Sequence, residues 1–571
     1  MAFWANTVRA MVMAAGLALP QMTAANGISG DYLAARQASF EGDFKAAALY
    51  YGRALMFEPG KPELLENAIL ANIALGEIDL ASVLADRLVE QGLPSQLAHM
   101  ALVSRDADSE NYAAILKAIE DKRGLGPLAD GLVRAWAQLG QGDMSGALLD
   151  FDAVKEVQGL APFASYHKAL ALASIGDFES ADAILGTDGA GGLGLTRRGV
   201  IAHTEILSQL DRNTEAVALL DRAFGSNVDP QLAEIRAALE AGDKLSFTHV
   251  RSPRDGMAEV FITIAGALST EGNDELTLLY ARMAEHLNPA SVDAMLLSAE
   301  VLESLRQFDL AVAAYGRVPA DDVSFHAAEL GRAGALRAQD KLSEATDVLR
   351  ALTETHGQLP IVHSTLGDLE RQQENFAAAS ASYTQALDLF AEVTPRQWYL
   401  YYTRGISFER QGEWDKAEAD FRKALELRPD QPQVLNYLGY SLVEKKMKLD
   451  EALDMIQRAA AAQPNAGYII DSLGWVLYRL GRYEESVPQM ERAAELMPID
   501  PIVNDHLGDV YWAVGRVREA EFMWKRALSF ADWEEASEEA DVDRIRRKIE
   551  VGLDQVLAEE GAPPLQVANG N

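Results

Sequence analysis

The residue types that most often carry catalysis are present in this chain, but their spacing does not match any catalytic arrangement. The nine histidines are scattered, and His356 and His363 fall in different predicted helices. The sequence contains no HExxH pair for zinc, no GxSxG nucleophile turn and no GxxxxGK[ST] phosphate loop. It also contains no cysteine, which excludes thiolate catalysis, thiolate metal sites, disulfides and lipidation through a cysteine. We therefore predict that the protein is not an enzyme and uses no cofactor and no metal.

The charge balance limits the kinds of molecule that the protein can bind. The chain has 86 acidic and 51 basic residues among its 571, a formal net charge of −35. Such a field repels nucleic acid, so we expect no nucleic-acid partner. Two interpretations of the acidity stay open: it keeps a long helical protein soluble, or it attracts a basic partner or peptide.

Four consecutive copies of one unit fill the segment from Trp398 to Glu534. The clearest copy, GYIIDSLGWVLYRLGRYEESVPQMERAAELMPID, runs from Gly467 to Asp500. Its eighth position is Gly474 and its fifteenth is Gly481. A small residue at the eighth position suits the crossing of two helices, where a larger side chain would cost about 1–3 kcal/mol. A glycine at the fifteenth position suits a left-handed turn after the first helix.

A repeat of about 34 residues, built as a pair of antiparallel helices, resembles the tetratricopeptide repeat. The resemblance covers nearly the whole chain and is strongest from Ala258 onward. It implies an all-α fold, a right-handed α-solenoid of about 14 units. The units are predicted to start near Ile28, Lys61, Gln96, Leu128, Pro162, Arg197, Ala258, Val292, His326, Pro360, Trp398, Pro432, Gly467 and Pro501.

Residues 1–25 have the pattern of an export signal. Arg9 precedes the apolar run from Ala10 to Leu19, and Thr23, Ala24 and Ala25 offer small residues for cleavage. The run is too short for a comfortable membrane span, and no later segment is long and apolar enough for one. We expect cleavage after Ala25 and a periplasmic or envelope-associated protein. An uncleaved anchor and an ordinary first helix remain alternatives.

The rest of the chain divides by the periodicity of its apolar residues. We predict an N-terminal array over residues 26–230, an irregular linker over 231–257 and a C-terminal array over 258–534. Within the linker, residues 231–241 are expected to form one lone helix. Pro253 and Gly256 are expected to break helical structure in residues 242–256, which either pack over the solenoid or serve as a clasp or docking loop. An amphipathic helix over 535–560 is expected to cap the last repeat, and 561–571 is expected to be disordered. The glycine-rich run 186–194 lacks a Lys-Ser/Thr pair and is interpreted as a loop between repeats.

The resemblance also implies a binding face. In the tetratricopeptide repeat family the first helix of each unit lines the concave side, chiefly through positions 2, 5, 9, 12 and 13. Carried onto this sequence, those positions form an aromatic and acidic stripe in the last four units. The candidate groove residues are Tyr399, Tyr402, Arg410, Asn436, Tyr440, Asp471, Trp475, Tyr478, Arg479, Asp505, Asp509 and Trp512.

Two roles for this stripe stay open. Aromatic rings supply contact area, an asparagine can bond a peptide backbone, and carboxylates attract lysine or arginine, so the stripe can bind a protein or peptide. The same rings can instead pack between neighbouring helices or under the capping helix. The C-terminal third is also similar to bacterial envelope repeat adaptors, which implies an envelope protease or a cell-wall enzyme as partner. We expect a scaffold or adaptor, or alternatively a structural part of an envelope export or assembly complex that uses its outer faces or ends.

Overall fold

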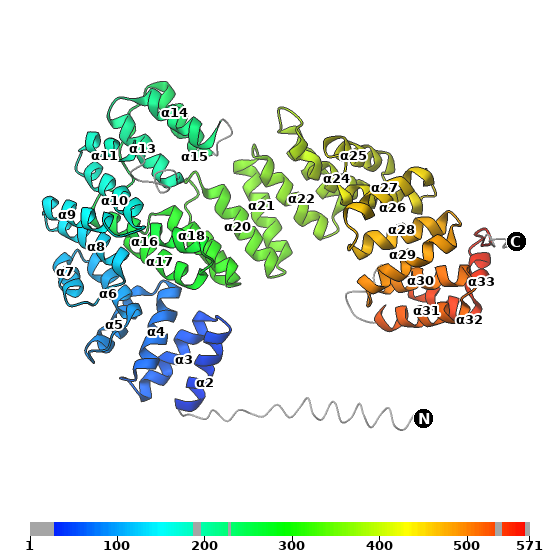
Figure 1. Ribbon diagram of the computed structural model, residues 1–571, viewed down its shortest axis with the longest axis horizontal. Coiled ribbons are helices and arrows are strands. Elements are labelled where there is room, and N and C mark those ends of the chain that lie inside the picture. The colour runs from blue at the N-terminus through cyan, green and yellow to red at the C-terminus, as the bar shows by residue number, and fades with distance from the viewer. Residues whose placement is uncertain (1–27, 187–195, 226–229, 532–539, 566–571) are drawn as a thin grey trace. The chain divides into compact units, whose positions relative to one another are not determined.

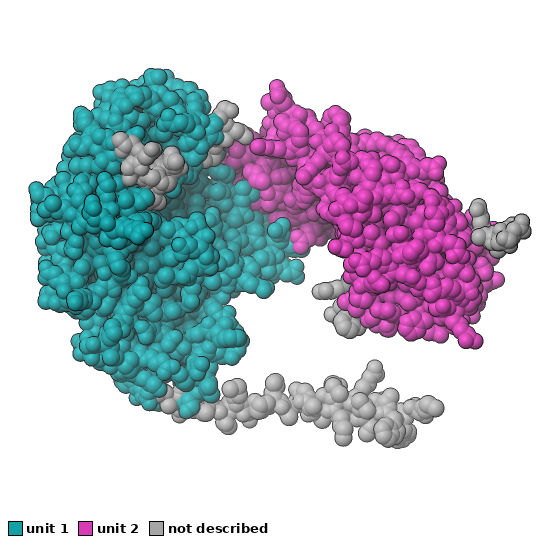
Figure 2. All heavy atoms as spheres, viewed as in Figure 1, with its two compact units in different colours: residues 1–348 teal, residues 349–571 magenta. Residues whose placement is uncertain are grey.

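The computed structural model describes residues 28–186, 196–225, 230–531 and 540–565. Within these ranges the regular elements are α-helices and one 3₁₀ turn, η2 (Pro395–Gln397) (Figure 1). They group into two compact units, residues 1–348 and 349–571 (Figure 2). The predicted signal segment and the glycine-rich run from 187 onward lie outside the described residues.

The helices of the first unit follow one another with short turns between them. They are α2 (Ile28–Phe40), α3 (Phe44–Phe57), α4 (Pro62–Leu75), α5 (Ile78–Val89), α6 (Gln96–Asp108), α7 (Tyr112–Glu120), α8 (Pro127–Gly140), α9 (Met144–Lys155), α10 (Ala161–Ser174), α11 (Phe178–Leu185), α13 (Arg197–Gln209), α14 (Asn213–Phe224), α15 (Pro230–Ala241), α16 (Pro253–Thr270), α17 (Asp274–Leu287), α18 (Val292–Ser304), α19 (Phe308–Tyr315) and α20 (Phe325–Ala338). The boundary between the units falls inside α21 (Leu342–His356).

The second unit continues the same pattern. Its helices are α22 (Pro360–Gln372), α23 (Phe376–Asp388), α24 (Trp398–Arg410), α25 (Trp414–Leu427), α26 (Pro432–Glu444), α27 (Leu449–Ala462), α28 (Gly467–Arg479), α29 (Tyr483–Leu496), α30 (Pro501–Ala513), α31 (Val517–Ala531), α32 (Val542–Val551) and α33 (Leu553–Glu559). Together with the first unit, the described residues form fourteen helix pairs, and every pair except one begins within one residue of its predicted start. The predicted all-α solenoid of helix pairs is confirmed.

The turn inside each of the fourteen pairs has a residue with positive φ at the fifteenth position, and the turn between α26 and α27 has a second one, Lys448. Eight of these residues are glycines: Gly42, Gly76, Gly142, Gly176, Gly272, Gly412, Gly481 and Gly515. In the other six turns the position is taken by Glu110, Asp211, Arg306, Asp340, Glu374 and Lys446. The backbone geometry of the turn is therefore kept even where the sequence loses its glycine, at a local cost of about 1–2 kcal/mol for a residue with a Cβ atom.

The small residue at position 8 lies where the two helices of a pair cross. A Cβ atom added to Gly474 would lie 2.2 Å from the sulfur of Met490, and one added to Gly508 would lie 2.4 Å from the Trp524 ring. Gly405 meets the ring of Phe421 in the same way, at 2.7 Å. The predicted reason for small residues at this position, close approach of the two helices, agrees with these distances.

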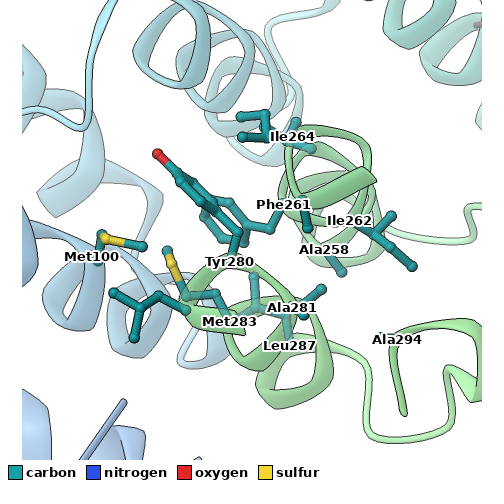
Figure 3. Packing of buried hydrophobic residues seen from close by; sticks show 14 of the residues in the cluster. Met100, Ala258, Phe261, Ile262, Ile264, Tyr280, Ala281, Met283, Leu287 and Ala294 are labelled. Carbon is teal, nitrogen blue, oxygen red and sulfur yellow. The ribbon is translucent and has the colours of Figure 1, made fainter. Parts of the chain in front are cut away.

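The first unit differs from a simple solenoid because its chain folds back. Helices α16 and α17 pack against α4, α6, α8 and α10, the first helices of four earlier repeats that are distant in the sequence. Figure 3 shows Tyr280 and Met283 of α17 beside Phe261 of α16 and Met100 of α6. Gly256 makes this approach possible, since a Cβ atom there would lie 2.3 Å from the Trp136 ring of α8. The earlier repeats thus bury part of their first-helix face against a later repeat of the same chain.

A buried polar network stabilises this fold-back. The Tyr166 hydroxyl of α10 donates to Glu259 of α16 at 2.8 Å and lies 3.0 Å from the His249 ring. Arg198 of α13 forms an ion pair with Glu259. Burial opposes the charge of Glu259, yet Arg198 and His249 hold the pKa of its carboxyl well below the usual range. The carboxylate therefore stays ionised, as a buried and paired charge.

The segment predicted as an irregular linker, 231–257, is partly helical. Its first part forms helix α15, as far as Ala241. Residues 243–252 connect α15 to α16 without regular secondary structure, and α16 begins at Pro253. Pro253 starts this helix instead of breaking it, because proline is favoured in the first turn and the Ser252 side chain caps it by accepting from the Asp255 N–H. The connection is held on α13 by Glu205, which accepts from the Thr248 and His249 backbones.

The second unit ends in two short helices where one capping helix was predicted. Gly552, with φ of 83°, separates α32 from α33. Ile545 and Leu553 from these helices are buried in the same core as α30 and α31. The two helices therefore cover the first helix of the last repeat, α30.

A candidate partner-binding surface in the second unit

The first helices of the repeats in the second unit, α22, α24, α26, α28 and α30, form a surface that we call the helix-A face. Their neighbours along this face contact one another, as α26 contacts α28 and α28 contacts α30. All twelve candidate groove residues lie on these helices. Their surroundings divide them into two groups, an open one toward α24 and a closed one toward α30.

Three tyrosines form the open group, the exposed tyrosine patch: Tyr399 and Tyr402 of α24 and Tyr468 of α28. Tyr399 is 41% exposed and Tyr468 is 46% exposed, which is unusual for rings of this size. Tyr402 lies behind them, stacked on Trp398 with ring centroids 6.2 Å apart. Burial and the neighbouring Tyr468 phenol raise the pKa of Tyr402 to about 12. Tyr402 therefore stays neutral, and the patch offers aromatic surface with hydroxyl groups.

Asn436 of α26 is the polar residue of this open region. Its side chain is buried, and its Oδ1 atom has no hydrogen-bond partner among the described residues. Tyr440 lies one turn further along α26 and is partly buried. A buried amide oxygen without a donor leaves desolvation uncompensated by about 1–3 kcal/mol, and a backbone N–H from a bound peptide would satisfy it.

The two candidate arginines lie at the carboxyl ends of their helices. The Arg410 guanidinium lies 4.9 Å from the centroid of the Phe376 ring and 3.8 Å from Glu374. Arg479 lies 5.9 Å from the Trp475 ring. Both guanidinium groups therefore lie near aromatic rings of the second unit. Tyr399 and Tyr468 of the exposed tyrosine patch lie at the opposite, amino-terminal ends of the same two helices.

The closed group begins with a stack of three rings. Trp475 of α28 lies parallel to Tyr478 at 4.8 Å and parallel to His506 of α30 at 3.9 Å. The Trp475 indole donates to Glu444 at 2.7 Å. Burial, followed by the charge of Asp509, raises the pKa of Tyr478. Trp475 and Tyr478 are both buried, so in this conformation they pack between adjacent repeats.

Asp471 of α28 holds the histidine of this stack. His506 Nδ1 lies 3.1 Å from the Asp471 carboxylate, and both residues are buried. Burial opposes protonation of His506, but Asp471 outweighs it, with help from Asp505 and Asp509, and raises its pKa. A charged imidazolium facing Trp475 also gains cation–π attraction.

Two further candidates, Asp505 and Asp509 of α30, bind a lysine of the same chain. The Lys548 ammonium of α32 lies 2.6 Å from a carboxylate oxygen of each. Its side chain is fully buried, and the Trp524 indole donates to Asp509 at 2.9 Å. The carboxylates that the sequence suggests for a basic partner are therefore occupied by an internal cation.

Trp512, the last candidate, is covered by the same helices. Its indole donates to Asp554 of α33 at 3.1 Å, and its ring lies 5.4 Å from that of Trp524. A Cβ atom at Gly552 would approach the Trp512 ring to 2.6 Å. The glycine that separates α32 from α33 thus also lets them pass closely over the ring.

Sequence reasoning alone missed two residues that decide the state of this surface. Lys548 belongs to the charged side of an amphipathic helix, where lysine is ordinarily solvated. His506 occupies a position outside the expected stripe. The only signal in the sequence was the acidic character of the last repeat, which favours some buried cation without identifying it.

The described residues were also searched for metal ligands and membrane helices. They contain no group of three or more His, Asp or Glu side chains arranged to hold a metal ion. Among the helices that the structure describes, none combines the length and the apolar character needed to cross a bilayer.

Comparison with known proteins supports the repeat assignment. Two tetratricopeptide repeat family models match the second unit, one over residues 364–432 and 402–467 and the other over 468–497. A TPR repeat-containing protein of Pseudomonas aeruginosa is 33% identical over 98 residues, and this alignment spans 17% of either chain. The residues matched by the family models include α24, α26 and most of α28 on the helix-A face.

Solved structures resemble the chain more distantly. The APC/C hetero-tetramer Cut9-Hcn1 is 15% identical, with a TM-score of 0.37 over 94% of this chain and 98% of the other. YrrB, described as a TPR protein with an unusual peptide-binding site, is 21% identical, with a TM-score of 0.27 over 33% of this chain and 94% of the other. The repeat assignment therefore depends on the sequence matches and on the helix pairs.

Proposed function

We propose that this chain, whose second unit contains tetratricopeptide repeats, is a non-catalytic scaffold that holds a partner protein on its helix-A face. The partner is expected to contact the exposed tyrosine patch and Asn436. Tetratricopeptide repeats commonly present such a face to other proteins, and α-solenoids offer extended binding surfaces. The partner itself is identified here only by the chemistry of that face.

Asn436 is the observation that carries this proposal. The buried amide oxygens of Asn213, Asn436 and Asn504 all lack a donor among the described residues, and of the three only Asn436 lies on a helix between the two that carry the exposed tyrosine patch. The residue lies between the repeats that carry Tyr402 and Tyr468, so a peptide crossing the face would meet rings on both sides. Rings with few rotatable bonds and an amide that bonds the backbone suit an extended peptide segment.

The cellular setting is part of the proposal. The export pattern of residues 1–25 and the similarity to envelope adaptors favour a periplasmic or envelope-associated protein. An envelope protease or a cell-wall enzyme is then a suitable partner. The N-terminal residue and the cell fraction of the mature protein test this setting directly, and a full-length cytoplasmic chain would contradict it.

Site-specific photo-crosslinking tests the binding face. A photoreactive phenylalanine replaces Tyr468 in the full chain, and the same group replaces Phe522 as a matched control, since Phe522 is exposed on α31, a second helix of its pair. We expect one protein to be captured from Tyr468 and not from Phe522. The captured protein is then purified and its affinity for the chain is measured directly.

Substitution completes the test. The double variant Tyr399→Ala with Tyr468→Ala should weaken that affinity at least tenfold, because exposed aromatic contacts dominate such interfaces. Asn436→Ala should weaken it by a similar factor. Phe522→Ala should leave it unchanged. Equal affinity of the double variant and the native chain would remove the tyrosine patch from the proposal.

A second candidate function rests on the first unit. Large apolar side chains are exposed on its two N-terminal helices, among them Phe40 of α2 at 88% and Met56 of α3 at 72%. Exposed apolar surface marks assembly interfaces in many proteins. A structural subunit of a larger complex would lose its co-purifying partners when Phe40 and Met56 are changed to Ser, while the tyrosine variants would leave them bound.

A further inference from the structure

A cavity of about 270 Å³ lies inside the first unit, far along the chain from the helix-A face of the second. It is formed by the turn between α4 and α5, the last turns of α17, and α19. Its polar walls are Arg282, Glu285, His286 and Arg317. Its apolar walls are Leu75, Leu310, Ala313 and Ala314.

The charges on these walls do not balance. Glu285 is the only carboxylate among the lining residues. Arg282 Nη1 donates to it at 3.1 and 3.3 Å, and Arg317 Nη2 donates to it at 2.6 Å. Two guanidinium groups thus share one carboxylate, and the cavity has an excess positive charge in a chain whose formal net charge is −35.

One of these guanidinium groups is buried. Arg282 is only 5% exposed, and its Nε donates to the Ala74 carbonyl at 3.1 Å. Burial, together with the charge of Arg317, lowers the pKa of Arg282, so an additional anion nearby would favour its charged form.

His286 adds a third polar group to the cavity. It follows Glu285 on α17, and its buried Nε2 atom has no hydrogen-bond partner in the described part of the chain. The His286 side chain lines the same cavity as the two arginines. As a neutral donor or as a cation it can bond an oxyanion.

We propose that this cavity is a binding site for a small oxyanion, a phosphate or carboxylate group, held by Arg282, Arg317 and His286. The guanidinium fork matches the geometry of both groups, and charge-assisted hydrogen bonds are strongest where water is excluded. The volume is close to the lower end of the range for small-molecule sites, which suits one anionic group on a short body. The proposal is independent of partner binding by the second unit.

Calorimetric titration of the full chain tests the site. Sodium phosphate and sodium succinate are titrated separately at constant ionic strength, with sodium chloride as the reference. We expect saturable binding of one anion per chain. Binding of phosphate alone identifies a phosphate site, binding of succinate alone a carboxylate site, and binding of both a general oxyanion site.

Two arginine variants locate the binding. Arg317→Gln removes one wall of the cavity, and since Arg317 is 46% exposed the variant should fold, as circular dichroism can verify. It should weaken binding at least tenfold. Arg212→Gln is the matched control, because Arg212 also contacts two acidic groups, Asp182 and Glu215, but lies outside the cavity. Its affinity should equal that of the native chain.

Three results would overturn the proposal. The native chain could show no saturable binding of either anion at tens of millimolar. Arg317→Gln could bind as tightly as the native chain, which would place the anion elsewhere. Arg212→Gln could lose binding to the same extent, which would mean that overall charge and not the cavity controls the affinity.

Discussion

At the scale of single residues, backbone conformation is repeated more faithfully than residue identity. The fifteenth position of every helix pair has positive φ, although only eight of the fourteen positions are glycine. The chain thus tolerates local strain at six turns because the packing of both helices around each turn determines its path. The sign of φ at a glycine should therefore predict whether substitution by alanine lowers or raises the free energy of unfolding.

Gly412 and Gly266 provide a matched pair for this expectation. A Cβ atom at either would meet no atom within 4 Å, but Gly412 has φ of 77° whereas Gly266 lies inside helix α16. Gly412→Ala should lower the free energy of unfolding by about 1–2 kcal/mol. Gly266→Ala should raise it by about 0.5–1 kcal/mol. Urea unfolding followed by circular dichroism measures both, and equal shifts would contradict the role of φ.

His506 should make the stability of the second unit depend on pH. Its folded pKa is raised above the ordinary value of 6.5 because Asp471 outweighs its burial. The stabilisation is therefore fully present below pH 6.5 and is lost as the pH rises through the raised pKa. Thermal unfolding midpoints between pH 6 and 9 should fall in the native chain.

The variant His506→Gln isolates this effect. Its midpoints should show a weaker decline over the same pH range, because the group that releases its proton is absent. Asp471→Asn should likewise reduce the decline, since the pKa of His506 then loses its main support. The same slope in all three proteins would assign the pH dependence to other groups.

At the scale of helices, later segments of the chain cover first helices of earlier repeats. Helix α32 places Lys548 against α30 at the end of the second unit, and α16 places Gly256 against Trp136 of α8 within the first unit. In both places a later helix covers a first helix that would otherwise face water. Terminal repeats of solenoids need such coverage, because a repeat cannot bury its apolar face alone.

Lys548→Met should destabilise the second unit by about 3–5 kcal/mol. The substitution keeps an apolar side chain of similar length but leaves Asp505 and Asp509 buried without their cation. Lys525→Met is the control, because Lys525 pairs with Glu521 on the surface and should change stability by less than about 1 kcal/mol. Chemical unfolding followed by circular dichroism compares the two. Similar small effects would mean that water reaches the two carboxylates in solution.

Gly256→Ala should destabilise the first unit by about 1–3 kcal/mol. The added Cβ atom would lie 2.3 Å from the Trp136 ring, so α16 or α8 must shift. The substitution should also change the tryptophan fluorescence of the folded protein, because the surroundings of the Trp136 ring change. A variant with native fluorescence and native stability would show that α16 is not seated on α8 in solution.

At the scale of the whole molecule, the net charge of −35 is the dominant electrostatic feature. It can serve solubility alone or steer a basic partner toward the chain. The closed acidic cluster of the last repeat favours neither, because its carboxylates form internal ion pairs with Lys548 and Arg544. The choice therefore depends on the long-range field and not on one contact.

Salt dependence of association decides between these roles. With the partner captured through Tyr468, the association rate constant should fall at least tenfold between about 50 and 500 mM sodium chloride if the partner is basic. Stopped-flow fluorescence measures this rate. A rate that is independent of salt would leave solubility as the role of the acidity.

Much of the fold could be predicted from local pattern, but the state of the candidate surface could not. Gly474 and Gly481 predict a helix crossing and a turn because both properties depend on neighbours within one repeat. Trp475 was assigned to the helix-A face correctly, yet its exposure depends on His506 and Glu444 in the adjacent repeats. Pro253 was predicted to break a helix, but it begins α16. Proline breaks a helix in the interior and is favoured in the first turn.

The sequence by itself determined the repeat, its helix pairs, its turns and the face on which aromatic and acidic residues gather. These properties follow from interactions over about 34 residues, which recur in each unit. Only the tertiary structure decided which parts of that face are open. Arg282 reaches the Ala74 carbonyl across 208 residues, and Lys548 reaches Asp509 across 39. Such contacts have no periodic signature, because they join segments that meet only when the chain folds back on itself.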